Sequence, residues 1–242
     1  MKTGNYLCFF LIFLLFTCNS KDAMMIYQPI RLSSPLTIDA NWDKNPWLRA
    51  PEARLTHYMG EKPEHFPDTR VKLAWDDSAI YVIFRVKDKF VRSVHRNHQD
   101  PVYRDSCVEF FFIPGEETGM GYFNLEMNCG GTMLFHHQTA PRTGSVSIRN
   151  EQIEQVMVAA TLPPIIDPEI EQDTTWVVEY RIPFSILGEY HDFEIPEKGM
   201  RWRANFYKCG DDTSHPHWLT WAPVDLPNPD FHQPEYFGWI EF

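Results

Sequence analysis

Two runs of alternating apolar and polar residues, 105–113 and 122–129, form the clearest pattern in the chain. The loop between them contains a proline and several glycines, so the pair predicts a β-hairpin. Successive side chains of a strand point to opposite faces of the sheet. If the loop closes symmetrically, Glu109 of the first strand lies opposite Glu126 of the second.

One face of this hairpin is apolar, whereas the other carries acids, amides and a cysteine. The same symmetrical register places Cys107 opposite Asn128. A solvated outer face is one interpretation of the polar side. The other is a site for a polyol or a cation, because carboxylates and amides supply hydrogen-bond acceptors and metal ligands. The pattern alone leaves both interpretations open.

Further short strands are expected along the rest of the chain, separated by Gly, Pro, Asn and Asp. Helical turns are expected before Trp47 and at 184–187, and a long polar loop is expected at 87–104. Roughly ten short strands of this kind predict an all-β fold, a two-sheet antiparallel β-sandwich of jelly-roll or immunoglobulin-like architecture with minor helical turns. The further strands are expected at 69–75, 79–86, 132–138, 145–150, 155–161, 176–182, 200–209, 219–221 and 236–242.

The first residues are typical of a targeting segment. An early Lys2 precedes an apolar run that is too short for a transmembrane helix. The run ends in LFTC, which is similar to a bacterial lipobox and makes Cys18 the expected lipidation site. The sequence therefore predicts a signal peptide with lipobox at 1–18, a polar tether at 19–29 and a single β-sandwich domain at 30–242. Such a protein is exported to the cell envelope and touches the membrane only through its lipid anchor.

The formal net charge of −11 argues against nucleic acid as a partner, because such binding depends on neutralising phosphates with Lys and Arg. Acidity is compatible with neutral sugars or with calcium. A structural calcium ion is a hypothesis that rests on Asp76, Asp77, Asp211 and Asp212 in predicted turns. Turn aspartates more often bind the backbone. Calcium is the only metal hypothesis that these turns support.

Apart from Cys8 and Cys18 of the targeting segment, the chain has three cysteines, Cys107, Cys129 and Cys209. The hairpin register puts Cys107 and Cys129 on opposite faces, so a disulfide between them is disfavoured. No pair has the CxxC spacing that is typical of zinc sites. Buried free thiols are therefore predicted.

Six segments of the mature chain follow one another as IDANWDKNPW (38–47), VKLAWDDSAIYVIFRVKD (71–88), DSCVEFFF (105–112), WVVEYRIPFSIL (176–187), RANFYKCGD (203–211) and PDFHQPEYFGWIEF (229–242). In this order they resemble the family 9 carbohydrate-binding modules, and the resemblance covers essentially the whole mature chain. It implies a two-sheet sandwich that holds the end of a sugar chain between two aromatic rings.

The resemblance also implies which residues form the sugar site. Tyr103 and Phe231 stand where the family has its two rings, which are typically tryptophans, so a different or weaker sugar ligand is expected. Asn124 stands where a family member can have arginine. An aromatic plane packs on the apolar face of a sugar, and polar side chains bond its hydroxyls. The polar contacts are expected from Glu109, Asn124, Glu126, Tyr207 and Asn228.

The leading prediction is non-catalytic binding of a mono- or oligosaccharide. Such binding would support polysaccharide capture or degradation, with a glycoside hydrolase as a possible partner. A glycoside hydrolase that uses Glu109 and Glu126 is the enzymatic alternative, because neighbouring strands can bring two carboxyl groups to about 5–5.5 Å. A haem-binding electron-transfer domain is the third. The sequence has no CxxCH attachment motif, and the candidate haem ligands are Met127, Met133, His136, His137 and Lys208.

Overall fold

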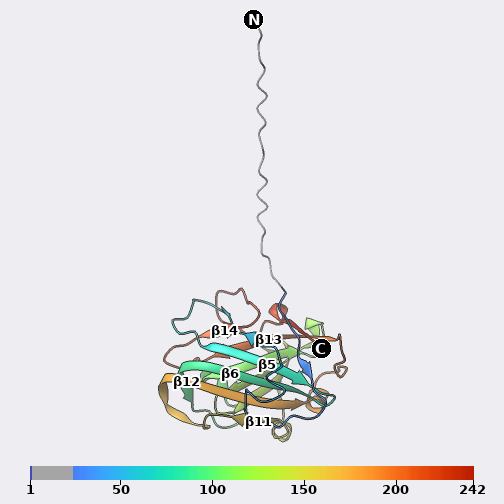
Figure 1. Ribbon diagram of the computed structural model, residues 1–242, viewed down its shortest axis with the longest axis horizontal. Coiled ribbons are helices and arrows are strands. Elements are labelled where there is room, and N and C mark those ends of the chain that lie inside the picture. The colour runs from blue at the N-terminus through green and yellow to red at the C-terminus, as the bar shows by residue number, and fades with distance from the viewer. Residues whose placement is uncertain (2–23) are drawn as a thin grey trace.

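A computed structural model of the protein describes Met1 and residues 24–242. Residues 2–18 of the predicted signal peptide, which include Cys18, and residues 19–23 of the predicted tether lie outside the described residues. None of the helices in the described part of the chain is long and apolar enough to cross a membrane. Strands dominate residues 24–242, and Figure 1 shows β6 (Ala79–Ser93) lying between β5 (Asp68–Trp75) and β12 (Ile166–Pro183) in one sheet.

The larger sheet contains the hairpin on which the sequence analysis centred. Its strands follow the order β1-β15-β13-β7-β8-β9-β10, and β14 links β13 to β4. The strands are β1 (Ile26–Tyr27), β4 (His57–Tyr58), β7 (Cys107–Ile113), β8 (Tyr122–Asn128), β9 (Met133–Ala140), β10 (Thr143–Ser147), β13 (Arg201–Cys209), β14 (Trp218–Thr220) and β15 (Gly238–Glu241).

The smaller sheet has the order β11-β12-β6-β5-β2, and β3 pairs with β5. Its remaining strands are β2 (Ile30–Arg31), β3 (Ala53–Arg54) and β11 (Met157–Ala160). The helical turns are η1 (Val102–Arg104), η2 (Thr118–Met120), α1 (Asn150–Ile153), α2 (Phe184–Leu187) and η3 (Pro234–Tyr236). The predicted β-sandwich with minor helical turns is confirmed, and α2 coincides with the predicted turn at 184–187.

The core lies between the two sheets and follows from the alternation along each strand. Phe110 and Phe112 of β7 face it together with Phe206 of β13, and Phe84 and Tyr180 approach from the smaller sheet. All five side chains are almost fully buried. Burying such a side chain contributes about 1.5–3 kcal/mol relative to leaving it exposed, so this layer holds the two sheets together.

The register of the hairpin is the one predicted. Glu109 pairs with Glu126, and Cys107 pairs with Asn128. Cys129 faces the core whereas Cys107 faces away from it, and both are free thiols, as is Cys209. The alternation of β7 and β8 was sufficient for this prediction because a one-residue slip would have turned the aromatic side chains out of the core.

Two boundaries and the direction of some strand pairs differ from the predictions. The loop expected at 87–104 is strand as far as Ser93, because β6 pairs with a long extension of β12 that begins at Ile166. Ile26 and Tyr27, which were assigned to the tether, form β1 beside β15. The sheets are also not wholly antiparallel, because β1–β15 and β2–β5 are parallel pairs.

The outward face of β7 and β8 is buried. Loops cover it, and a second hydrophobic cluster that includes Phe111, Tyr122 and Tyr207 forms beneath them. Glu109 and Glu126 are 2% and 5% exposed. The interpretation of this face as a solvated surface is therefore wrong, because the loops at 98–106 and 222–237 close over it.

A buried carboxylate fastens the segment 38–47 to the smaller sheet. Glu179 of β12 is fully buried on the outer face of the sheet. Its Oε2 accepts hydrogen bonds from the backbone N–H groups of Asp39 (2.9 Å) and Ala40 (2.7 Å). The carboxylate also accepts from Lys44 Nζ (2.9 Å) and from Trp47 Nε1 (2.8 Å). Both oxygens are thus satisfied, and this carboxylate has a structural role.

Candidate functional site

A cavity of about 220 Å³ lies over the outer face of β7, β8 and β13. It is smaller than the about 300–1,000 Å³ pockets that hold drug-sized ligands, and it suits a small polar ligand such as one sugar ring. Its floor comes from these strands, and its walls come from η1 and the loops on either side of β14. The lining includes Tyr103, Glu109, Phe111, Glu126, Arg142, Cys209, Asp211, Trp218, Asp230, Phe231 and His232.

Two neighbouring carboxyl groups form the floor. Glu126 Oε1 accepts a hydrogen bond from Asn124 Nδ2 (3.0 Å), and Asn124 Oδ1 accepts one from Gln138 Nε2 (3.1 Å). Glu109 Oε1 accepts one from the thiol of Cys209 (3.2 Å). Glu126 Oε2 is buried and has no hydrogen-bond partner among the described residues. An orphaned buried oxygen is costly, so a ligand that donates to it gains from this arrangement.

Burial raises the pKa of these acids. The pKa of Glu109 lies well above its usual range because of burial and the nearby Cys209 and Glu126. Burial raises the pKa of Glu126 to about 7, against the opposing effect of the bond from Asn124. The pKa of Asp211 is raised for the same main reason. A protonated carboxyl group both donates and accepts hydrogen bonds. A sugar hydroxyl does the same, so the two groups can bond in either direction.

Tyr103 forms one aromatic wall, and its position is fixed by the loop before β7. The fully buried Asp105 accepts hydrogen bonds from the backbone N–H groups of Val94 (3.1 Å) and His95 (3.0 Å), and its Oδ2 accepts another from Asn128 Nδ2 (2.9 Å). These bonds hold η1 over the floor. The ring of Tyr103 is 37% exposed, so it is available to a ligand.

Trp218, the first residue of β14, supplies a second aromatic wall. Its Nε1 donates to Asp211 Oδ1 at 2.8 Å, which orients the indole beside the cavity. Backbone hydrogen bonds tie the neighbouring loop to η1, because the N–H of Asp211 donates to the carbonyl of Tyr103 (3.3 Å). The two aromatic walls are thus mechanically connected.

Phe231 lines the cavity but is largely packed. Its ring stacks on Tyr207 with a centroid distance of 4.1 Å and an interplanar angle of 11°. Tyr207 is fully buried, and its hydroxyl donates to the carbonyl of Phe231 at 3.1 Å. One face of the Phe231 ring is therefore covered by protein.

An ion pair closes the rim of the cavity. Arg142, in the turn between β9 and β10, contacts Asp230 at 2.9 Å. His232, two residues after Asp230 in the same loop, forms a hydrogen bond through Nδ1 with the hydroxyl of Tyr122 (2.7 Å). Burial and the charge of Arg142 lower the pKa of His232 to about 4, so its ring is neutral near pH 7.

The predicted site residues fall into three groups. Four of them, Tyr103, Glu109, Glu126 and Phe231, line the cavity together. Asn124 and Tyr207 lie behind the cavity lining, where they form hydrogen bonds with Glu126 and Phe231. Asn228 is exposed and does not belong to the lining.

Three residues of the cavity lining, Arg142, Asp211 and Trp218, were not predicted as part of the sugar site. Trp218 stands in a strand of only three residues, and Arg142 stands in a turn with no periodic signal. A search for tryptophans at strand ends could have found Trp218. Asp211 follows β13 directly and was considered only as a calcium ligand.

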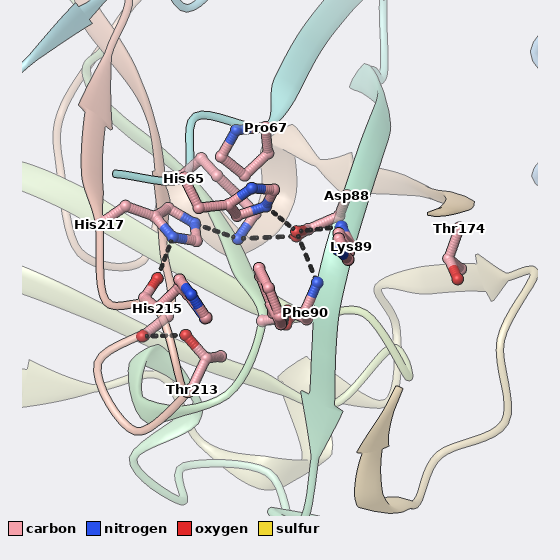
Figure 2. A network of polar contacts seen from close by, with 12 residues as sticks. His65, Pro67, Asp88, Lys89, Phe90, Thr174, Thr213, His215 and His217 are labelled. Carbon is pink, nitrogen blue, oxygen red and sulfur yellow. Dashed lines mark hydrogen bonds and ion pairs between the residues drawn. The ribbon is translucent and has the colours of Figure 1, made fainter. Parts of the chain in front are cut away.

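A second polar cluster lies between the sheets. Figure 2 shows His65, Asp88 and His217 pointing toward one another. Lys208 of β13 is fully buried, and its Nζ lies 2.7 Å from His217 Nε2 and 3.5 Å from Asp88 Oδ2. His65 Nε2 contacts Asp88 Oδ1 at 2.7 Å, while His217 Nδ1 donates to the carbonyl of His215 at 2.9 Å. The polar groups are engaged with one another, so we assign this cluster a structural role.

The candidate haem ligands are occupied elsewhere. Met127 and Met133 are packed in the core, Lys208 belongs to the cluster between the sheets, and His136 bonds Ser145 (3.2 Å) and Ser147 (3.1 Å). His137 packs against Phe123 and His191. None of the five lines the cavity.

Asp76 and Asp77, the first pair of aspartates suggested as calcium ligands, instead bind groups of the protein. Asp76 Oδ1 accepts from the N–H groups of Ser78 (2.7 Å) and Ala79 (2.9 Å), and Oδ2 accepts from the hydroxyl of Tyr81 (2.6 Å). Asp77 contacts Arg31 at 2.5 Å on the surface. This arrangement is the ordinary role of a turn aspartate.

Comparison with known proteins identifies the family. Residues 49–242 match carbohydrate-binding family 9. The chain belongs to this family. The cavity therefore lies in a family 9 sandwich, on the outer face of the sheet that contains the hairpin. No curated protein matches the sequence.

Solved structures share the fold. A candidate carbohydrate-binding protein from Bacteroides uniformis ATCC 8492 has a TM-score of 0.80 and 26% identity, over 91% of this chain and all (100%) of its own. A family 9 module from Caldicellulosiruptor kristjanssonii in complex with cellotriose has a TM-score of 0.61 and 18% identity, over 90% and 93% of the two chains. A family 9 module from that organism with glucose has 17% identity and a TM-score of 0.61, over 90% and 95%.

Proposed function

We propose that the protein binds the end of a mono- or oligosaccharide in the cavity over β7, β8 and β13, and that it does so without catalysis. The decisive observation is that two aromatic side chains and a set of buried, partly unsatisfied acids line one small cavity. The Caldicellulosiruptor module structures hold glucose and cellotriose, which makes a glucose-type sugar the first ligand to test.

The chemistry of the cavity matches a sugar in two ways. Tyr103 and Trp218 offer planes for the C–H face of the ring, and such planes supply contact area with little loss of rotamer freedom. Glu109, Glu126 and Asp211 face the position that the hydroxyls would occupy. A protonated carboxyl group donates as well as accepts hydrogen bonds, so the acids fix the orientation of the ring.

The floor acids support binding better than hydrolysis. A glycosidase places its two carboxyl groups on either side of the scissile bond. Glu109 and Glu126 instead pair across neighbouring strands and form one floor, where Asn124 and Cys209 hold one oxygen of each. We infer that a separate glycoside hydrolase degrades the bound polysaccharide.

Calorimetry with glucose and cellotriose tests the proposal, after a glycan array with the full chain. We expect a dissociation constant on the order of 10⁻⁴ M, because a single ring offers little area. Trp218→Ala and Tyr103→Ala should each weaken binding by about tenfold, or 1–2 kcal/mol. Phe66→Ala is the matched control, because Phe66 is also 37% exposed but lies outside the cavity lining.

Two outcomes would contradict the proposal. Equal weakening by Phe66→Ala would mean that the cavity is not the binding site. Release of reducing sugar that disappears in Glu109→Gln would show a glycosidase instead of a binding module.

We further propose that the protein is exported and anchored to the cell envelope through a lipidated Cys18. The support is the apolar run followed by LFTC and a polar stretch. Several acyl chains anchor stably where one does not, so the wild-type chain should enter the detergent phase on phase partitioning. Cys18→Ala should remain in the aqueous phase. Equal aqueous recovery of both would exclude the anchor.

A further inference from the structure

Two thiols and a carboxyl group meet beneath the sugar cavity. Cys107 of β7 and Cys209 of β13 are direct cross-strand partners on the outward face of the sheet. Glu109 follows Cys107 by two residues and therefore shares that face. All three are buried, and one ligand atom from each lies within 4.8 Å of the other two.

We propose that Cys107, Glu109 and Cys209 bind one zinc ion. Zinc prefers thiolate sulfur at about 2.3 Å and carboxylate oxygen at about 2.0–2.2 Å in a tetrahedral arrangement. A tetrahedron with such bonds has edges of about 3.5–3.8 Å. Cys209 Sγ lies 3.2 Å from Glu109 Oε1, and Cys107 lies within 4.8 Å of both. Small rotations about the side-chain bonds complete the geometry, because both strands are fixed by their ladder.

The fourth position of the ion faces the cavity. Cys209 and Glu109 both line it, whereas Cys107 lies behind them. Glu126 pairs in register with Glu109 and lines the same cavity. Its Oε2 is buried and has no hydrogen-bond partner in residues 24–242. Water on the ion would supply the donor that this oxygen lacks, and a tetrahedral zinc with three protein ligands keeps such an open position.

Local charge also favours a cation here. The cavity lining contains Glu109, Glu126 and Asp211, and its arginine, Arg142, is paired with Asp230 at the rim. Lys208 neighbours Cys209 in sequence, but it points to the other face of β13, toward Asp88. Within residues 24–242 no basic side chain forms an ion pair with Glu109, so a divalent ion would balance the charge of the three ligands.

Zinc binding is a proton exchange with solvent. Each thiol loses its proton as the Zn–S bond forms, and Glu109 binds as the carboxylate. Two thiolates and one carboxylate leave the site with one net negative charge around the 2+ ion. No oxidant or reductant takes part. The site does not depend on sugar binding, and metal alone is the probe.

Cobalt substitution of the full chain, kept reduced in detergent, tests the site. Co²⁺ bound by thiolates gives near-ultraviolet charge-transfer absorption, and a tetrahedral site gives intense visible bands. We expect wild-type protein to develop both with one Co²⁺ per chain, and stoichiometric Zn²⁺ to remove them. Glu109→Gln should keep the thiolate absorption and bind at least tenfold more weakly.

The matched control is Cys129→Ser, because Cys129 is also a buried free thiol but faces the core. It should retain the cobalt spectrum, whereas Cys107→Ser and Cys209→Ser should lose it. Far-ultraviolet circular dichroism of each variant shows whether it is folded. Absence of thiolate absorption in reduced wild-type protein would overturn the proposal without reference to any variant. A spectrum that persists in the Cys107→Ser/Cys209→Ser double variant would overturn it as well.

Discussion

Phe231 illustrates how one side chain serves both the site and the scaffold. Its ring stacks on Tyr207 and is only 8% exposed, yet it lines the cavity. The resemblance to family 9 modules implied a free platform for sugar at this position. In the structure one face of the Phe231 ring is covered by Tyr207, so only the other face can contact a sugar.

Phe231→Ala should therefore lower stability as well as binding. Truncating a buried Phe costs about 3–5 kcal/mol, and the residual exposure of Phe231 places the expected loss near 3 kcal/mol. Denaturant unfolding measures this loss, and calorimetry with sugar measures the affinity. Tyr207→Phe is the companion variant, because it keeps the stacking and removes only the hydroxyl that bonds Phe231. It should cost about 1 kcal/mol. Unchanged sugar affinity in Phe231→Ala would show that the ring is scaffold alone.

At the scale of elements, the segment 38–47 depends on one residue of a distant strand. Glu179 of β12 receives four hydrogen bonds from this segment. The segment in turn covers Tyr81 and Ile83 on the outer face of the smaller sheet, with Trp47 fully buried. Loss of the carboxylate should loosen this whole layer.

Glu179→Gln should destabilise the protein by about 3 kcal/mol, because a neutral amide replaces a charged acceptor and turns an NH₂ group toward donors. For a domain of this size, that corresponds to a fall in Tm of about 6–12 °C. Glu171→Gln on the same strand is the control, since Glu171 is exposed and should change stability by less than about 0.5 kcal/mol. Equal melting of both variants would contradict the role assigned to Glu179.

The same scale shows what the sequence could predict. The register of β7 and β8 was predictable because alternating aromatic residues leave a single register that buries them all. The extension of β6 to Ser93 was not predictable, because its polar residues are typical of a loop. Only its pairing with β12 makes it a strand. The site shows a similar division. Glu109 and Glu126 follow from strand periodicity, whereas Trp218 reaches the cavity through the pairing of β14 with β13.

At the scale of the whole molecule, a polar cluster joins the two sheets. Lys208 projects from the larger sheet and Asp88 from the smaller one. His65 and His217 lie beside Asp88, as Figure 2 shows. Lys208 and Asp88 are almost fully buried. Coulomb attraction with Lys208 and the bond with His65 hold the pKa of Asp88 below its usual range, although burial opposes them.

Acid should weaken the fold through His217. Burial and the charge of Lys208 lower its pKa to about 3, whereas a histidine in the unfolded chain has a pKa of about 6.5. The unfolded state therefore binds the proton first as the pH falls, and stability is lost progressively between about pH 6.5 and 3. The contribution from His217 alone is about 2 kcal/mol between pH 7 and 5. His65, a member of the cluster, also contacts the ring of His215, which stacks on Phe90.

Unfolding by urea at pH 7 and pH 5 measures this loss. His217→Gln retains an acceptor for Lys208 but cannot bind the proton, so its stability should depend less steeply on pH by up to about 1.4 kcal/mol per unit. His57→Gln serves as the comparison, because His57 lies on β4 outside the cluster. An identical pH dependence in wild type and His217→Gln would show that the ring is not the group that titrates.

The two faces of β7 and β8 also constrain how this family can diversify. Every second residue of these strands belongs to the core, and Glu109, Phe111 and Glu126 of the opposite face form the floor of the cavity. An exchange of floor residues is therefore tied to the packing of the whole sandwich. The turn that carries Arg142 has no such tie, whereas Phe231 is held by its packing on Tyr207. Related sandwiches should therefore acquire new ligand preferences through changes in the turn at the rim of the cavity, while the floor residues are retained.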